Sequence, residues 1–185
     1  MKIRRLLILC LAAFMTVLPL TACGDKEVET QTDTYDTADA ATPLSNKEFP
    51  DARIKSTKDF KEVVGEVLTD YIDCVNSYSE YTQAHEYEFA QGMTVKQIPG
   101  YQDSFECWYE WFYKISSVDD DDVPDEFKSI WQHFKNMAMH NKPRLDEVYS
   151  CNVNDMAIKM DEVLEYDSTE VEAIQTEYSA LLTAE

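Results

Sequence analysis

The chain has 185 residues, of which 44% are hydrophobic, so it is long enough for one ordinary domain with a packed core. Its formal net charge is −20, and such an excess of carboxylates repels phosphate backbones and disfavours nucleic acid as a partner. It contains only 4 glycines and 6 prolines. An all-β fold of this length would need more turn-forming residues, so the composition favours helices.

The first 22 residues have the parts of a secretion signal. Residues 1–5 are basic, and Leu6–Leu20 is an uncharged apolar run, shorter than the roughly 20 residues of a membrane-spanning helix. The sequence Leu20-Thr21-Ala22-Cys23 follows at once, and it resembles the lipobox of bacterial lipoproteins. The resemblance implies that diacylglycerol is attached to Cys23 and that the signal is cleaved before it. It also implies a membrane anchor on the extracytoplasmic face of the cell membrane, or at the outer membrane of a two-membrane host.

Residues 23–52 are predicted to form a lipidated, acidic and disordered tether. The stretch is rich in Asp, Glu and Thr and has no apolar periodicity, so it cannot bury enough surface to offset its ordering entropy. We place an acidic helical domain at residues 53–185. Residues 51–185 contain 29 acidic and 11 basic side chains, a net charge of −18.

A first amphipathic helix is predicted from about Ser56. Its apolar stripe recurs at three- and four-residue steps and comprises Phe60, Val63, Val64, Val67, Tyr71, Cys74, Val75, Tyr78 and Thr82. Ser56 and Asp59 resemble a variant of the capping box. If the helix continues, His85 and Phe89 remain on the same stripe, and Gly92 can end it.

Two further helices follow a stretch with Pro99 and Gly100. The first has an aromatic stripe of Tyr101, Phe105, Trp108, Trp111, Phe112 and Ile115. The second is predicted to open at Asp122 or Val123, with Pro124 in its first turn. Its apolar face comprises Phe127, Ile130, Trp131, Phe134, Met137 and Ala138. Pro143 is expected to end or kink this helix.

The residues after Pro143 are predicted to form one helix or two. A fourth stripe comprises Leu145, Tyr149, Val153, Met156, Met160, Val163 and Leu164. Asp167-Ser168-Thr169 interrupts that pattern and could cap a last helix. The fold class is therefore all-α, a small bundle of four or five antiparallel helices.

The aromatic segment 105–113 supplies the candidate ligand-binding residues. Most of its rings share one helical arc and are expected in the core, because large aromatic side chains dominate core burial. Tyr109 and Tyr113 lie beyond the edge of that arc. Together with Trp111, they are candidates to line a groove for a sugar ring or a peptide.

Three other patterns contain residue types that occur in catalytic or metal sites. Glu106 and Glu110 share the solvent-facing side of the aromatic helix, in the manner of paired carboxylates in glycosidases. Asp119–Asp122 has hard ligands for Ca²⁺ but lacks the spacing of an EF-hand loop. Met137-Ala-Met139-His140 has soft ligands, but its methionines point about 160° apart on a helix. We therefore predict no catalytic residue, no metal site and no cofactor.

Cys74, Cys107 and Cys151 stay in the mature chain beside Cys23. Outside the cytosol they allow one disulfide and one free thiol, in any of three pairings. The sequence favours a non-enzymatic module that binds a basic protein or peptide, since its charge attracts cationic partners. The alternatives are a small carboxylate-dependent envelope hydrolase and an extracytoplasmic metal binder.

Overall fold

The computed structural model describes residues 44, 47–55 and 58–183. Four long helices dominate this part of the chain: α2 (Phe60–Ala84), α4 (Tyr101–Ser116), α5 (Lys128–Val148) and α6 (Val153–Thr183). The short helix α3 (Glu86–Ala90) follows α2, and short 3₁₀ turns lie in the connections. No β-strand occurs in the described ranges. The all-α prediction is confirmed.

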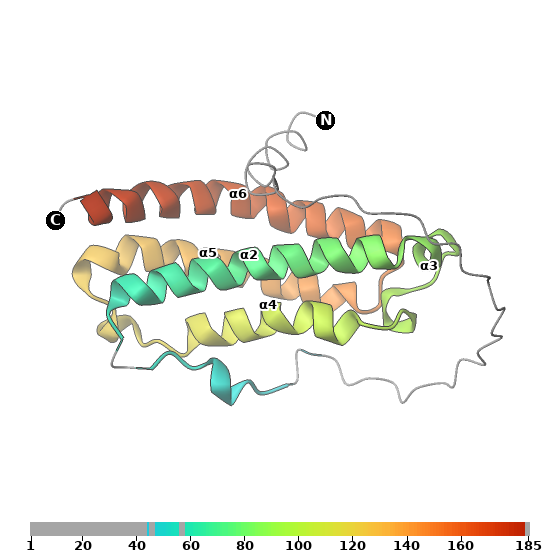
Figure 1. Cartoon of the computed structure of the whole chain (residues 1–185), viewed down its shortest axis with the longest axis horizontal. Helices are drawn as coiled ribbons and strands as arrows, with labels where there is room; N and C mark the ends of the chain where they lie inside the picture. Colours follow the sequence, from blue (N-terminus) through green and yellow to red (C-terminus); the bar gives the residue numbers. More distant parts are fainter. Residues whose placement is uncertain (1–43, 45–46, 56–57, 184–185) are drawn as a thin grey trace, which may run out of the picture. The chain divides into compact units, whose positions relative to one another are not determined.

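The four long helices run alternately up and down the bundle (Figure 1). Helix α2 packs against α4, α4 against α5, and α5 against α6. The hydroxyl of Tyr178 on α6 donates a hydrogen bond of 3.0 Å to the carbonyl of Lys61, which brings α6 back to the start of α2. Short connections favour antiparallel neighbours, so this order agrees with the predicted bundle.

Aromatic side chains fill the centre of the bundle, as the stripe on α4 predicts. Trp108, Trp111 and Trp131 are each at most 1% exposed. Tyr71 of α2 meets the Trp108 ring edge-on, with 5.7 Å between the ring centroids. Edge-to-face pairs of this kind add about 0.5–1.5 kcal/mol beyond the burial of their area. The aromatic stripe therefore positions α2 against α4.

Helix α2 begins at a side-chain cap and ends at a kink. The carboxylate of Asp59 accepts a hydrogen bond of 3.0 Å from the backbone N–H of Lys61. Ser56, the predicted cap, lies outside the described residues. At His85 the backbone leaves the helical region (φ −116°, ψ 23°), so the residues beyond it form the separate helix α3.

Helix α5 starts later than predicted, and it runs through Pro143. Pro124 caps the 3₁₀ turn Asp125–Phe127, and the α-helix begins only at Lys128. The expected end or kink at Pro143 does not break the helix, which continues to Val148. Leu145 and Val148 are completely buried, and burial of this last turn outweighs the hydrogen bond that the proline removes. Leu145 therefore belongs to α5.

Helix α6 is continuous, so the alternative in which a last helix begins at Asp167–Thr169 is excluded. The helix runs from Val153 to Thr183, and Asp167 lies in its middle with no exposed surface. Its carboxylate accepts a hydrogen bond from Asn141 of α5 and does not cap a helix. The described residues after Pro143 therefore belong to two helices, the end of α5 (143–148) and α6 (153–183), and they divide at residues 149–152.

Two loops are joined at one end of the bundle. The backbone N–H of Val95 donates to the carbonyl of Cys151 at 2.9 Å, and that of Lys96 donates to the carbonyl of Tyr149 at 3.2 Å. Asn152 then caps α6, because its side-chain oxygen accepts from the N–H groups of Asn154 and Asp155 at 2.9 and 3.0 Å. The chain reversal between α5 and α6 is therefore fixed at residues 149–152.

The end of the predicted tether is packed on the bundle. Leu44 and Phe49 are 3% and 6% exposed, and Lys47 forms an ion pair with Glu106 of α4. The tether boundary is therefore wrong for residues 44 and 47–52, because two large apolar side chains in this polar stretch reach the core. Cys23, the signal and residues 24–43 lie outside the described residues. Within the described residues, no helix combines the length and apolar character needed to cross a membrane.

Candidate functional site

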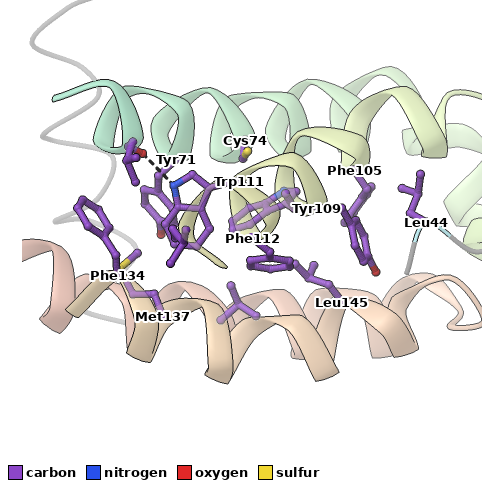
Figure 2. Close-up of a cluster of buried hydrophobic side chains, with 14 of the residues drawn as sticks. Leu44, Tyr71, Cys74, Phe105, Tyr109, Trp111, Phe112, Phe134, Met137 and Leu145 are labelled. Carbon is purple, nitrogen blue, oxygen red and sulfur yellow. Dashed lines mark hydrogen bonds between the residues drawn. The ribbon is translucent and has the colours of Figure 1, made fainter. Parts of the chain in front are cut away.

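Two of the three candidate ligand-binding residues are core residues (Figure 2). Trp111 is 1% exposed, and its Nε1 donates a hydrogen bond of 2.8 Å to the carbonyl of Val67. Tyr109 is 4% exposed, and its hydroxyl donates to the carboxylate of Asp146 at 2.9 Å. Helix α4 is thus buried over a wider arc than its sequence indicates. A ligand would have to displace these contacts to reach either ring.

Tyr113 is the candidate nearest to solvent. Its side chain is half-buried, and its hydroxyl accepts hydrogen bonds of 3.1 and 3.0 Å from Nε and Nη2 of Arg53. The guanidinium carbon of Arg53 also lies 5.9 Å from the centre of the ring. Arg53 therefore occupies the hydroxyl of Tyr113 and lies near its ring, where a ligand would have to compete with it. A ligand-binding role for these three residues stays a prediction.

The paired carboxylates of α4 do not converge on a common group. Glu106 is engaged by Lys47, whereas Glu110 is exposed to solvent. A retaining or inverting glycosidase needs two carboxyl groups facing each other across the substrate. These two side chains lie one turn apart on the same helix, so the geometry offers no such gap. The hydrolase alternative gains no support here.

The candidate metal segments have other partners. Asp119 accepts a hydrogen bond from the N–H of Asp121 at 3.1 Å, and Asp120 binds Lys135 through both carboxylate oxygens at 2.8 Å. Met137 is fully buried while Met139 is 76% exposed, as expected for side chains on opposite faces of α5. Across residues 44, 47–55 and 58–183, no group of three or more His, Cys, Asp or Glu side chains could hold a metal ion.

An open depression of about 600 Å³ lies at the end of the bundle near α3. It is lined by Glu86, Phe89, Ala90, Gly92, Asn152, Val153 and Asn154. Glu86 is the only ionisable residue in this lining. Acid–base or nucleophilic catalysis needs several convergent reactive groups, so the depression does not have the composition of an active site.

A buried polar cluster joins three helices, and the sequence did not reveal it. Oδ2 of Asp167 on α6 accepts a hydrogen bond of 2.8 Å from the side-chain amide of Asn141 on α5, and both residues are completely buried. Tyr71 of α2 lies close to the same carboxyl group, whose Oδ1 has no hydrogen-bond partner among the described residues. Only the interruption of the apolar pattern at residue 167 marked this position, and we interpreted it as a helix cap.

The environment of Asp167 changes its titration. Burial raises the pKa of its carboxyl from 3.8 to about 7, while Tyr71 and the hydrogen bond from Asn141 act in the opposite direction. Burial, together with the negative charge of Asp167, also raises the pKa of Tyr71. A carboxyl group that titrates near neutrality has the pKa of a general acid or base. Because it is sealed inside the bundle, it acts on stability and not on a substrate.

A few side-chain contacts connect α2 with α6 on another side of the bundle. Tyr178 contacts Lys61 and lies close to Gly65, and Asp167 meets Tyr71 farther along the two helices. Residues three or four positions from these contacts lie on the same side of each helix. They form two sets along the line where α2 faces α6. The sets are Leu68, Ile72 and Val75 on α2, and Leu164, Ser168 and Val171 on α6. We call this surface the α2–α6 face.

Ile72 is the exposed apolar side chain of the α2–α6 face, at 45%. The other four apolar members are half-buried, and Leu68, Val75 and Val171 pack against the core. Ile72 and the accessible edges of these side chains form an apolar strip that a partner can cover.

Carboxylates border the α2–α6 face. Asp161, Glu165 and Glu172 of α6 and Asp73 of α2 are exposed. In the part of the chain that the structure describes, none of these four forms an ion pair. Lysines of α5, in contrast, are paired with Asp120 and Asp146. The negative charge is therefore left unneutralised at this face.

Comparison of the chain with protein-family models, with curated proteins and with solved structures gave no match. The contacts, burial and charges of the described residues are therefore the basis of the proposals below.

Proposed function

We propose that this chain is an exported, lipid-anchored and non-enzymatic module that binds a basic protein or peptide outside the cytosol. The lipid on Cys23 would hold it on the extracytoplasmic face of the cell membrane, or at the outer membrane of a two-membrane host. Two or three acyl chains anchor a protein firmly, whereas one chain gives only marginal binding. The single observation that supports the binding role is the α2–α6 face, with its apolar centre and unpaired carboxylates.

The chemistry of this face favours one kind of partner. Unpaired carboxylates attract lysine and arginine side chains, and they steer the encounter before contact. Exposed Ile72 and the accessible edges of its half-buried neighbours can be covered by apolar groups of a partner. A basic amphipathic helix carries both kinds of side chain, with apolar anchors at three- and four-residue spacing. We therefore propose a basic amphipathic segment as the occupant.

Site-specific photo-crosslinking in living cells tests the binding role. A photoreactive amino acid is placed at Ile72 or at Ser168 on the α2–α6 face, and at Gln132 on the exposed side of α5 as the matched control. We expect products from the first two positions and not from Gln132. The captured peptide should be rich in lysine or arginine. Equal products from all three positions, or capture of an acidic segment, would contradict the proposal.

The anchor has a separate test. Mass spectrometry of the chain extracted from membranes should find an acylated cysteine at position 23 as the first residue. Cys23→Ser should move the protein from the membrane fraction to the soluble fraction, whereas Cys151→Ser should leave it in the membrane. An exported chain that begins elsewhere, or that keeps its membrane association after Cys23→Ser, would overturn the lipoprotein proposal.

A further inference from the structure

The contacts between α2 and α4 place two cysteines opposite each other. Tyr71 of α2 contacts Trp108 of α4, with 5.7 Å between ring centroids, and Tyr78 contacts Phe105 at 6.1 Å. Because the helices are antiparallel, a residue between 71 and 78 on α2 lies opposite one between 105 and 108 on α4. Cys74 and Cys107 occupy these intermediate positions.

The two cysteines are neighbours, and both are free thiols in the structure. Burial and then the neighbouring Cys107 thiol raise the pKa of Cys74, while the Cys107 thiol donates to the carbonyl of Ser104 at 3.5 Å. Cys74 is 1% exposed and lies on the inward side of α2 (Figure 2). Cys107 is half-buried, so an external reagent can reach its sulfur first.

Cys151 has different surroundings. It lies in the loop between α5 and α6, where its thiol donates to the carbonyl of Glu147 at 3.3 Å. The charged groups that act on its thiol are Lys159, Asp155 and Glu147. The placement of Cys74 opposite Cys107, between two pairs of contacting rings, therefore distinguishes one pairing from the three that the sequence leaves open.

We infer that Cys74 and Cys107 form a disulfide that joins α2 to α4, while Cys151 stays a free thiol. The reaction needs a disulfide donor, such as an oxidising thiol–disulfide oxidoreductase or oxidised glutathione. The Cys107 thiolate attacks the donor disulfide, forms a mixed disulfide and releases one donor thiol. The Cys74 sulfur then attacks Cys107 and releases the second thiol. The two cysteines lose two electrons and two protons, and the donor disulfide is reduced to two thiols.

The bond would constrain the unfolded chain, because it closes the loop between α2 and α4. Formation of the bond inside cells rests on the proposed export, since thiols stay reduced in the cytosol. Formation in a test tube does not depend on the location of the protein. Comparing the chain taken from cells with the purified chain therefore distinguishes a failure of the pairing from a failure of the proposed export.

Thiol trapping followed by peptide mass spectrometry tests the inference. In the full chain taken from cells and alkylated at once, we expect a Cys74–Cys107 linked peptide and alkylated Cys151. The purified chain, first reduced and then placed in oxidised glutathione, should form the same linked peptide. Cys151→Ser should keep the bond and Cys107→Ser should lose it. The oxidised wild-type chain should unfold at a higher urea concentration than the reduced chain.

Three results would overturn the pairing. They are a disulfide that contains Cys151 in the wild-type chain, three free thiols after treatment with oxidised glutathione, and an oxidised chain that is no more stable than the reduced one. A chain that forms the bond with glutathione but is fully reduced in cells would support the pairing and contradict export.

Discussion

The side-chain amide of Asn141 donates a hydrogen bond of 2.8 Å to the carboxyl group of Asp167, and neither residue has exposed surface. This contact joins α5 to α6 in the centre of the bundle. Tyr71 of α2 lies close to the same carboxyl group, whose Oδ1 has no hydrogen-bond partner among the described residues. A polar group at this depth is costly unless it is hydrogen-bonded, so the contact with Asn141 favours the alignment of α5 and α6 that makes it.

Asp167→Asn should remove a pH dependence of stability. The folded-state pKa of about 7 lies above the ordinary 3.8, so the folded chain holds this proton more tightly than the unfolded chain. The resulting stabilisation is complete below the ordinary value and is lost as pH rises through the folded value. Relative to wild type, the variant should gain stability between about pH 4.5 and about pH 8, by at most roughly 4 kcal/mol.

Urea denaturation of both proteins at the two pH values measures this difference. Asp161→Asn, at an exposed position of the same helix, is the matched control and should show no comparable change with pH. An equal stability difference between Asp167→Asn and wild type at both pH values would show that Asp167 does not titrate as proposed.

Lys114→Met should give the opposite dependence on pH. Nζ of Lys114 lies 2.8 Å from Oε1 of Glu66 and 2.5 Å from Oδ2 of Asp70. Hydrogen bonds from Lys114 and then from Lys58 lower the pKa of Glu66, so this stabilisation is present above the ordinary 4.5 and is lost in acid. We expect a loss of about 1 kcal/mol at neutral pH, because these carboxylates are partly screened by solvent.

The loss on Lys114→Met should shrink when denaturation is repeated in acid. Lys128→Met is the control, since Lys128 forms an exposed pair with Asp125, and it should leave the midpoint unchanged. A cost of Lys114→Met that is the same in acid as at neutral pH would mean that lost packing, and not lost ion pairing, causes it.

Pro143→Ala should stabilise the bundle. Pro143 is exposed inside α5, where it has no N–H to donate to the carbonyl of Met139. An interior proline costs about 3 kcal/mol, partly offset because proline also restricts the unfolded chain by roughly 0.4–1 kcal/mol. Thermal denaturation should therefore show a gain of about 2–2.6 kcal/mol. Destabilisation by alanine would indicate that the proline ring itself makes a needed contact.

Trp111→Phe should reduce stability and leave partner capture intact. The change removes the hydrogen bond to the carbonyl of Val67 and leaves a small void, which should cost about 1–3 kcal/mol. Photo-crosslinking from Ser168 should give the same product from the folded variant, because Trp111 is a core residue. Loss of capture by a folded Trp111→Phe protein would restore Trp111 as a ligand-binding residue.

The apolar periodicity predicted the bundle because each long helix buries one stripe. Phe60 to Tyr78 on α2 and Tyr101 to Ile115 on α4 are examples in which the pattern and the burial agree. The helix ends were predicted less well. Pro143 is a local signal to stop, but the buried turn around Leu145 overrides it.

The buried cluster and the α2–α6 face depend on neighbours that the sequence alone does not identify. Asp167 has the sequence signature of a cap, and only the presence of Asn141 and Tyr71 on other helices makes it a core residue. Tyr109 is likewise buried by contacts with α5 that helical spacing on α4 does not report. In the sequence, the carboxylates of the α2–α6 face cannot be told apart from the other acidic residues of this acidic chain.

The binding proposal is tested most directly by the yield of the crosslink from Ser168 when the charge of the α2–α6 face is reversed. Glu165→Lys with Glu172→Lys should lower the yield about tenfold, because the partner is basic. Glu110→Lys with Glu126→Lys makes the same change in net charge at exposed positions on other elements, and it should leave the yield near that of wild type. Equal yields from both double variants would contradict recognition of a basic partner at this face.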